Sequence, residues 1–559
     1  MSLLIQGILF LTALWLTRWF WLRLSAQRML NNISGPQSPS FWMGNMAEIW
    51  SPYGWDFHHE LGEKYGGVVK FGALFGEKQL YVFDPKSLHQ IMVKDQHIFE
   101  ETDSMIRGTR VSFGEGILSS VGEQHRKQRK MLNPVFSVAH LRHMGMFFFR
   151  LSTLQTRSGL VPLFFGVGKR LQAVLESKVQ NGPQEVDMLM WMARCALELV
   201  GQAGLGHSFD PLVDDTIPPY ILSLKNFGTT MHRMALPAQY ILPWASQIGS
   251  PKFRRFIVNM IPWKDLHTGR DITDMMYSTA VHIYNTKKAA LEAGDEAVSQ
   301  QISQGNDIIS ILMKDNDNAS SADRLSEVEI LGQLNTLVFA ATDTTSSALS
   351  RALHILAQHP DAQEKLRQEI RSAQKDGVDL SYDELVSMEY LDAVCRETLR
   401  LYPPVSFLQR VARKDAILTM STPITTVDGS MVTEIPIPAD THIMVSILAA
   451  NRNPTVWGPD VLEWKPERWL SPLPKSVADA HVPGIYANLM TFNGGGRACI
   501  GFKFSQLEMK VVLCLLVERF KFSMSDGKVI TWRMSSISVP VADKNSDVPQ
   551  LPLKIELAK

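Results

Sequence analysis

The segment FNGGGRACIG, residues 492–501, contains the side chains best suited to bind a metal-containing cofactor. Its glycines allow a tight turn and a close approach to a flat molecule. Arg497 can reach a carboxylate on the rim of such a molecule through a charge-assisted hydrogen bond. Residues 502–518 are mostly apolar with helical spacing, which places Cys499 near a helix N-terminus, where an anionic sulfur is favoured. This combination predicts a thiolate that binds the iron of a haem.

The ten residues also fit the F-x-x-G-x-R-x-C-x-G signature of the cytochrome P450 superfamily, which the chain resembles from about residue 40 to 555. The membrane-anchored microsomal members, and the fungal ones in particular, are the most similar. The resemblance implies haem b as the cofactor, with Cys499 as the axial iron ligand and with Phe492 and Arg497 as further haem contacts. The alternative is a free cysteine buried ahead of a core helix, since cysteine is among the most buried residue types.

Residues 326–329, SEVE, have the pattern of a capping box and predict the start of a helix that continues to about Gln358. The middle of this helix reads AATDTT at residues 340–345. Small residues let a flat cofactor approach, and an acid beside an alcohol in apolar surroundings can relay protons. The alternative is a polar stripe on an amphipathic helix. The segment resembles a motif of the family, which implies that Thr344 donates a hydrogen bond to bound dioxygen and that Asp343 relays protons.

Glu397 and Arg400, three residues apart, lie on one face of a predicted helix and can form an ion pair. Such pairs are common on solvated surfaces, so this spacing alone indicates little. Residues 466–469, PERW, resemble the segment of the family that brings a second arginine to the pair. The resemblance implies a buried triad of Glu397, Arg400 and Arg468 whose role is structural.

Residues 122–130, GEQHRKQRK, resemble the segment in which the family usually has Trp-x-x-x-Arg. His125 stands in the place of the tryptophan, a departure often met in fungal members, and Arg129 stands in the place of the arginine. The resemblance implies that both bind the haem propionates, and that Arg410 does so too. The other bases of the segment are expected to face outward, either as a solvated face or as a surface that docks an acidic electron donor.

The composition is that of an ordinary globular protein with room for a large core. The 559 residues are 45% hydrophobic and 20% charged, and 56 basic residues balance 56 acidic ones. Zero net charge gives no reason to expect a nucleic acid as a partner. The four cysteines have no paired spacing, so neither a disulfide framework nor a zinc motif is indicated, as expected for a reducing compartment.

The first residues form a candidate membrane anchor. Residues 2–17 carry no charge, and tryptophans and arginines follow at residues 18–28. A spanning helix needs about 20 apolar residues, so the aromatic residues would have to complete it at the membrane interface. The arginines place the following chain on the cytosolic side. A single-pass anchor in the endoplasmic reticulum membrane is therefore expected, with a cleaved signal peptide as the alternative.

The expected organisation is an anchor at residues 1–24, a connector with proline and glycine at 25–45, and one catalytic domain at 46–559. Residues 145–160 interrupt an otherwise continuous helical pattern where the resembled family usually has no insertion. This segment is interpreted either as an extra surface loop, which a wrong gene model would explain, or as a genuine helix extension.

Helical patterns dominate from about residue 125 to 400, whereas strand-like patterns are short, such as those near 66–84 and 405–447. The expected fold class is therefore mainly α with minor β (α+β). The resemblance implies the cytochrome P450 fold, a helix-rich body around a buried haem with small β-sheets.

The resemblance implies a monooxygenase that inserts one oxygen atom of O2 into a lipophilic small molecule, such as a terpenoid or steroid of secondary metabolism. No G-x-G-x-x-G motif in a βαβ context is present, so NADPH is expected to act through a separate cytochrome P450 reductase, with cytochrome b5 as a further candidate donor. Two other classes stay open: a haem-thiolate isomerase or dehydratase that needs no reductase, and a non-catalytic haem protein.

Residues 236–263 are mostly apolar and contain several basic residues. A segment of this kind can lie in a membrane surface and give lipophilic substrates a lateral entry. The alternative is ordinary packing in the core.

Overall fold

Two compact units make up the part of the chain that the structure describes. The structure is a computed structural model, and it describes residues 6, 27–137, 160–303, 305–374, 378–546 and 548–559. The first unit comprises residues 27–102, 407–461 and 474–498, and is named here the β-rich unit. The second, the helical unit, comprises the described parts of 103–406, 462–473 and 499–559. Each unit is described by itself.

The β-rich unit is built on a five-stranded sheet with the strand order β1-β2-β8-β5-β3. Strands β1 and β2 form the hairpin that was predicted near residues 66–84, with Val69 opposite Tyr81. Two further antiparallel pairs, β6 with β7 and β9 with β10, complete the strands of the unit. The strands are β1 (Val68–Gly72), β2 (Lys78–Val82), β3 (Phe99–Glu100), β5 (Phe407–Ala412), β6 (Ala416–Thr425), β7 (Met431–Ile437), β8 (His442–Ser446), β9 (Gly484–Tyr486) and β10 (Leu489–Gly494).

Short helices surround these strands. They are α2 (Met46–Ile49), α3 (Trp55–Tyr65), α4 (Pro85–His89), α21 (Ile447–Asn451), α22 (Pro454–Trp457) and α23 (Lys475–Asp479), together with the single turns η1 (Gln27–Asn32), η2 (Leu74–Gly76), η3 (Gln90–Lys94) and η8 (Gly495–Arg497). Gly495 has a φ of +67°, and a Cβ on it would meet the carbonyl oxygen of Met92 at 1.9 Å. Only glycine therefore fits where η8 packs against η3.

Helices form most of the helical unit. They are α5 (Asp103–Phe113), α6 (Gly122–Leu132), α8 (Leu160–Val179), α9 (Met188–Leu199), α10 (Pro219–Arg233), α11 (Ala235–Tyr240), α12 (Leu242–Ala245), α13 (Pro251–Met260), α14 (Lys264–Ala293), α15 (Asp295–Ser299), α16 (Ile308–Asn318), α17 (Glu327–Gln358), α18 (Pro360–Ala373), α19 (Tyr382–Ser387), α20 (Glu389–Leu401) and α24 (Phe502–Arg519). Short turns are η4 (Ile117–Ser119), η5 (Pro134–Phe136), η6 (Val200–Leu205) and η7 (Pro466–Trp469).

Two small sheets accompany these helices. One has the order β11-β14-β4 and the other pairs β12 with β13. Their strands are β4 (Gln184–Asp187), β11 (Phe520–Met524), β12 (Thr531–Arg533), β13 (Val539–Val541) and β14 (Pro552–Leu557).

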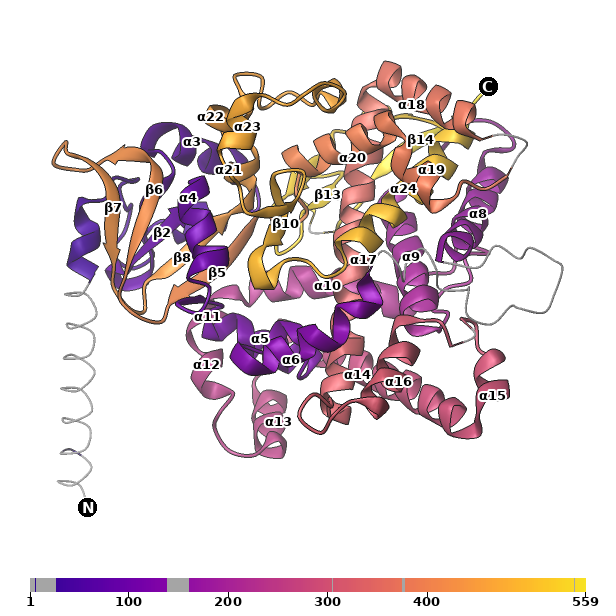
Figure 1. Ribbon diagram of the computed structural model, residues 1–559, viewed down its shortest axis with the longest axis horizontal. Helices are drawn as coiled ribbons and strands as arrows, with labels where there is room; N and C mark the ends of the chain where they lie inside the picture. The colour runs from indigo at the N-terminus through magenta and orange to yellow at the C-terminus, as the bar shows by residue number, and fades with distance from the viewer. Residues whose placement is uncertain (1–5, 7–26, 138–159, 304, 375–377, 547) are drawn as a thin grey trace. The chain divides into compact units, whose positions relative to one another are not determined.

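Helix α17 is the central element of the helical unit. Its capping box forms as predicted, because Ser326 accepts from the N–H of Glu329 and the Glu329 carboxylate accepts from the N–H of Ser326. With 32 residues it is about 48 Å long. It packs against α9, α14, α20 and α24 (Figure 1), and most of its side chains are buried. A buried helix of this length gives the residues at its middle a fixed position.

Within the described residues, helices dominate and the strands fall into five small sheets. The predicted α+β class is therefore confirmed. No helix in these residues combines the length and the apolar character that a membrane crossing requires. The predicted anchor at 1–24, apart from Gln6, and the predicted insertion at 145–160, apart from Leu160, lie outside the described residues.

Candidate active site

The thiol of Cys499 lies two residues before Gly501, the N-cap residue of α24. Cys499 is exposed, whereas the other three cysteines of the chain are buried. Burial among protein atoms raises the pKa of the Cys499 thiol, and the backbone N–H of Gly501 and the charge of Arg129 oppose this rise. Because protein atoms desolvate the sulfur, its accessible surface is not in open solvent. The sulfur can be reached by a bound group and has the N–H donor and the cation that favour a thiolate.

Helix α6 carries His125 and Arg129, which are four residues apart and therefore on one face. His125 is buried. Burial lowers the pKa of Arg129, and its interaction with Cys499 raises it. The structure thus brings Arg129 to Cys499 within the helical unit and places His125 one helical turn away.

Of the three other bases of this helix, Arg126 and Lys130 are exposed, as predicted, and Lys127 is partly buried. Each contacts a carboxylate of the chain itself: Arg126 contacts Glu123, Lys127 contacts Glu329 at 3.5 Å, and Lys130 contacts Asp323 at 2.8 Å. They line a cavity of about 600 Å³ in which four carboxylates face three bases. The face is locally slightly acidic, because two of these carboxylates, Glu329 and Asp323, come from chain segments far from α6.

The middle of α17 carries an accessible stripe on an otherwise buried surface. Between Glu329 and Ala357 only Phe339, Ala340, Ala341 and Thr344 are not buried. Ala340, Ala341 and Thr344 lie on one side of the helix, since Thr344 follows the two alanines by four and three residues, whereas Phe339 lies at the edge of this side. The Thr344 hydroxyl donates to the Ala340 carbonyl at 2.7 Å. The two alanines allow a flat group to approach the helix backbone closely.

Asp343 does not lie on this stripe. Its carboxylate is buried and accepts from the Lys225 ammonium of α10 at 2.7 Å, and Lys225 also donates to the Ser346 hydroxyl at 3.0 Å. The sequence analysis missed Lys225, which is 118 residues away along the chain. No local pattern around Lys225 signalled this contact. Asp343, the residue predicted to relay protons, therefore forms an ion pair with Lys225.

Glu397, Arg400 and Arg468 come together in the interior of the helical unit. Arg400 donates to both carboxylate oxygens of Glu397, at 2.9 and 2.8 Å, and Arg468 reaches it at 3.3 Å. Two donors that the sequence did not indicate complete the set: the indole N–H of Trp469 at 2.9 Å and the backbone N–H of Lys465 at 3.1 Å. Both come from the segment that contains Arg468.

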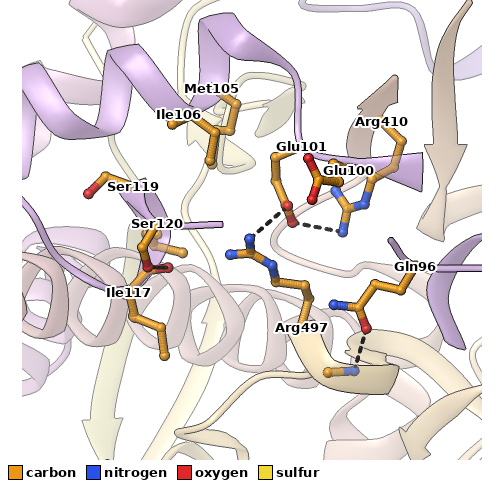
Figure 2. A network of polar contacts seen from close by, with 12 residues as sticks. Gln96, Glu100, Glu101, Met105, Ile106, Ile117, Ser119, Ser120, Arg410 and Arg497 are labelled. Atoms are coloured by element: carbon orange, nitrogen blue, oxygen red, sulfur yellow. Dashed lines mark hydrogen bonds and ion pairs between the residues drawn. The ribbon is translucent and has the colours of Figure 1, made fainter. Parts of the chain in front are cut away.

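In the β-rich unit, Arg410 of β5 and Arg497 of η8 meet at one carboxylate, that of Glu101 (Figure 2). Burial lowers the pKa of Arg410, and Glu101 raises it. Phe492 of β10 is buried and packs edge-to-face against Tyr486, with ring centroids 5.6 Å apart. The contact of Glu101 with Arg410 was not predicted, because the two residues are more than 300 positions apart in the sequence.

These residues fit a haem. Cys499 offers an accessible sulfur, which is a ligand for haem iron, at a helix N-terminus. Ala340 and Ala341 leave room beside α17 for a planar group. Arg129, Arg410 and Arg497 carry guanidinium groups, which bind carboxylates such as propionates.

This fold and this site define a haem-thiolate enzyme, and comparison with known proteins agrees. The chain belongs to the cytochrome P450 family, whose model matches residues 34–545. It is therefore a cytochrome P450 oxidoreductase, and family membership implies haem with a cysteine thiolate ligand and dioxygen as co-substrate.

The curated relatives are fungal P450 enzymes of the same length. Cytochrome P450 monooxygenase 91 of Postia placenta is 48% identical, over 99% of both chains. The ganoderic acid synthetase CYP5150L8 of Ganoderma lucidum is 41% identical over 96% of both chains. The P450 monooxygenase eriI of Hericium erinaceus is 35% identical over 97% of this chain and 96% of its own.

Proposed function

We propose that this enzyme inserts one oxygen atom of O2 into a lipophilic terpenoid, with electrons from an NADPH-dependent reductase. The observation that carries the proposal is the accessible stripe of α17, where Ala340 and Ala341 lie beside Thr344, one residue after the buried acid Asp343. A relay of protons needs an acid and a hydroxyl at this position. The same unit contains the accessible thiol of Cys499.

When bound, haem supplies the activation of dioxygen, which thiolate ligation favours. The chain's own residues then have three tasks. Gly501 donates its N–H to the sulfur of Cys499 and stabilises its negative charge. The Thr344 hydroxyl turns from the Ala340 carbonyl, to which it donates at 2.7 Å, toward the reacting oxygen.

Asp343 has the third task, which is to pass protons to the Thr344 side of α17. Its carboxylate must separate from Lys225 to do so, because the 2.7 Å ion pair occupies one of its oxygens. We expect α10, which carries Lys225, to influence the proton supply for this reason.

A lipophilic substrate suits the aromatic side chains next to the stripe. The ring of Phe339 stacks on Phe113 of α5 at 4.7 Å and contacts Phe227 of α10 edge-on at 5.1 Å. Three helices thus contribute one apolar cluster beside Ala340. The name of the Ganoderma relative supports a triterpenoid among the lipophilic classes.

We also propose that the enzyme acts at the endoplasmic reticulum membrane. Core packing, the alternative considered for residues 236–263, does not hold for α13, which has no buried residue. Exposed apolar side chains gather on this stretch: Trp244, Phe253, Phe256 and Met260. Lys252 and Arg254 lie among them, and a surface of this composition suits an interface with anionic lipid. A reductase, with cytochrome b5 as a second donor, is expected on the same membrane.

One observation favours a second candidate, a haem-thiolate isomerase or dehydratase that needs no reductase. Asp343 is not free to relay protons while it pairs with Lys225. Such an enzyme would convert a peroxide substrate in the absence of NADPH.

The test reconstitutes the full-length protein in vesicles with a P450 reductase and a panel of triterpenoids. NADPH consumption, product and hydrogen peroxide are measured for the wild type and for Thr344→Ala. We expect the variant to keep its haem and to divert electrons to peroxide, with product about 100-fold lower, since a positioned proton donor contributes at least about 10²-fold. Unchanged coupling would contradict the role of Thr344. Turnover of a peroxide without NADPH would support the second candidate instead.

A further inference from the structure

The contact between Glu101, Arg410 and Arg497 is an unusual arrangement for two side chains that fit haem carboxylates. The Arg410 Nη2 lies 3.3 Å from Glu101 Oε1, and the Arg497 Nη2 lies 3.0 Å from Glu101 Oε2 (Figure 2). The carboxylate of Glu101 therefore occupies one donor of each arginine. All three side chains lie in the β-rich unit.

The backbone fixes Glu101 in this position. Strand β3 pairs antiparallel with β5, with Phe99 opposite Ala412 and Glu100 opposite Val411. The next step of this register brings Glu101 opposite Arg410. The carbonyl of Glu101 also accepts from the Arg413 guanidinium at 2.8 Å.

Arg497 is held against the same stretch of chain. The side-chain oxygen of Gln96 accepts from the N–H of Gly496 at 2.9 Å (Figure 2). Residues 96–101 thus contact η8 twice, once through an amide at Gly496 and once through a carboxylate at Arg497. The meeting of the two arginines with Glu101 is part of the packing of the unit and not a chance surface contact.

This cluster holds charged groups away from water. Two guanidinium groups face one carboxylate, and all three side chains are largely buried, with exposed fractions of 5% for Arg410, 10% for Arg497 and 11% for Glu101. Buried charges are costly unless they are paired. Haem carries two carboxylates.

We propose that Glu101 is an internal competitor of the haem carboxylates. In the haem-free protein it pairs with Arg410 and Arg497 and so stabilises two buried cations. When haem binds, its carboxylates take over these donors and Glu101 must give way. Glu101 is thus a positioning residue that preforms the site and weakens haem retention. This inference rests on the proposed haem-thiolate function.

The experiment compares the full-length holoprotein with Glu101→Gln, which has the same shape and lacks the charge. Haem transfer to excess apomyoglobin is followed by absorbance. We expect the variant to lose haem on the order of tenfold more slowly, which corresponds to one charge-assisted hydrogen bond. The haem-free variant should unfold at a lower temperature than the haem-free wild type. Equal or faster haem loss from Glu101→Gln would overturn the proposal.

The matched control is Glu100→Gln. Glu100 is the neighbouring residue and contacts Arg413 at 3.4 Å, and both of these side chains are more exposed than Glu101. Glu100→Gln removes the same charge as Glu101→Gln. If it also slowed haem loss, the effect would come from the net charge and not from the position of Glu101, and the proposal would be overturned.

Two further measurements keep the test decisive. Glu101→Asp keeps the charge on a shorter side chain and is expected to lose haem at an intermediate rate, so it serves if Glu101→Gln does not fold. Reconstitution with the dimethyl ester of haem, which has no carboxylates, should abolish the difference between the wild type and the variants. A wild type that binds no haem would instead contradict the proposed function, before Glu101 is tested.

Discussion

Two glutamates in this protein each meet two arginines, and their surroundings differ. Glu397, in the helical unit, accepts five hydrogen bonds. Two come from Arg400, and one each comes from Arg468, the indole N–H of Trp469 and the backbone N–H of Lys465. Glu101, in the β-rich unit, forms two ion-pair contacts with the residues that the structure describes, at 3.3 and 3.0 Å.

This difference indicates that Glu397 stabilises the fold, whereas another carboxylate can replace Glu101 at its two arginines. A carboxylate with five donors is fully satisfied, and removing it takes away one hydrogen-bond partner from each of these donors. Glu101 contacts one nitrogen of each arginine, so another carboxylate can compete with it for the same two donors. The number and geometry of the donors, and not the residue types, distinguish the two roles.

The largest effect is expected from Glu397→Gln. The change removes the carboxylate charge that Arg400 and Arg468 both contact, and breaking a buried ion pair costs about 3–5 kcal/mol. We expect little or no folded, haem-containing protein, measured by haem content and by thermal unfolding.

The control for this change is Glu467→Gln, on the residue next to Arg468. Glu467 pairs with Lys365 and both side chains are about half exposed, so its loss should cost less than about 1 kcal/mol. If Glu397→Gln and Glu467→Gln lowered the stability by similar amounts, the buried cluster of Glu397 would not differ in energy from an exposed ion pair.

The ion pair of Lys225 with Asp343 should be intermediate. Both side chains are 10% exposed, and each has few partners. Lys225→Met and Asp343→Asn are each expected to lower the free energy of unfolding by about 2–3 kcal/mol, because each leaves one buried charge alone. The double variant should lose less than the sum, with a coupling of about 1–3 kcal/mol by chemical denaturation. Additive losses would show that the two side chains do not interact.

The smallest effect is expected from Trp469→Phe. This variant removes one of the hydrogen bonds that Glu397 accepts, so that Glu397 has fewer donors and becomes more like Glu101. A hydrogen bond to a charged group contributes about 1.5–3 kcal/mol. Trp464→Phe is the control, because the Trp464 indole donates to the neutral hydroxyl of Thr398 at 3.1 Å. Thermal unfolding should show a smaller loss for the control. A larger loss for Trp464→Phe would contradict the view that the charge of Glu397 sets the strength of its contacts.

The sequence predicted what depends on short spacings or on a motif. The pair of Glu397 and Arg400 follows from a spacing of three residues on a helix, and the place of Cys499 ahead of α24 follows from the apolar run behind it. The family motif added Arg468, which is 71 residues from Glu397.

The sequence did not predict contacts that depend on the pairing of distant segments. Glu101 meets Arg410 because β3 pairs with β5, and Lys225 meets Asp343 because α10 packs against α17. The ion pairs of the α6 lysines were missed for the same reason, since Glu329 and Asp323 reach them from other segments. The sequence shows which side chains are charged, but it does not show which opposite charge a distant segment brings to them.

The central claim is that Cys499 binds haem iron as a thiolate. The most direct test is the reduced, carbon-monoxide difference spectrum of membranes that contain the full-length protein, its Cys499→Ala variant or Cys514→Ala, which changes a buried cysteine of α24. The account predicts the red-shifted Soret band of thiolate-bound haem for the wild type and for Cys514→Ala, and its loss in Cys499→Ala. A folded wild-type protein without this band, or a Cys499→Ala variant that keeps it, would contradict the account.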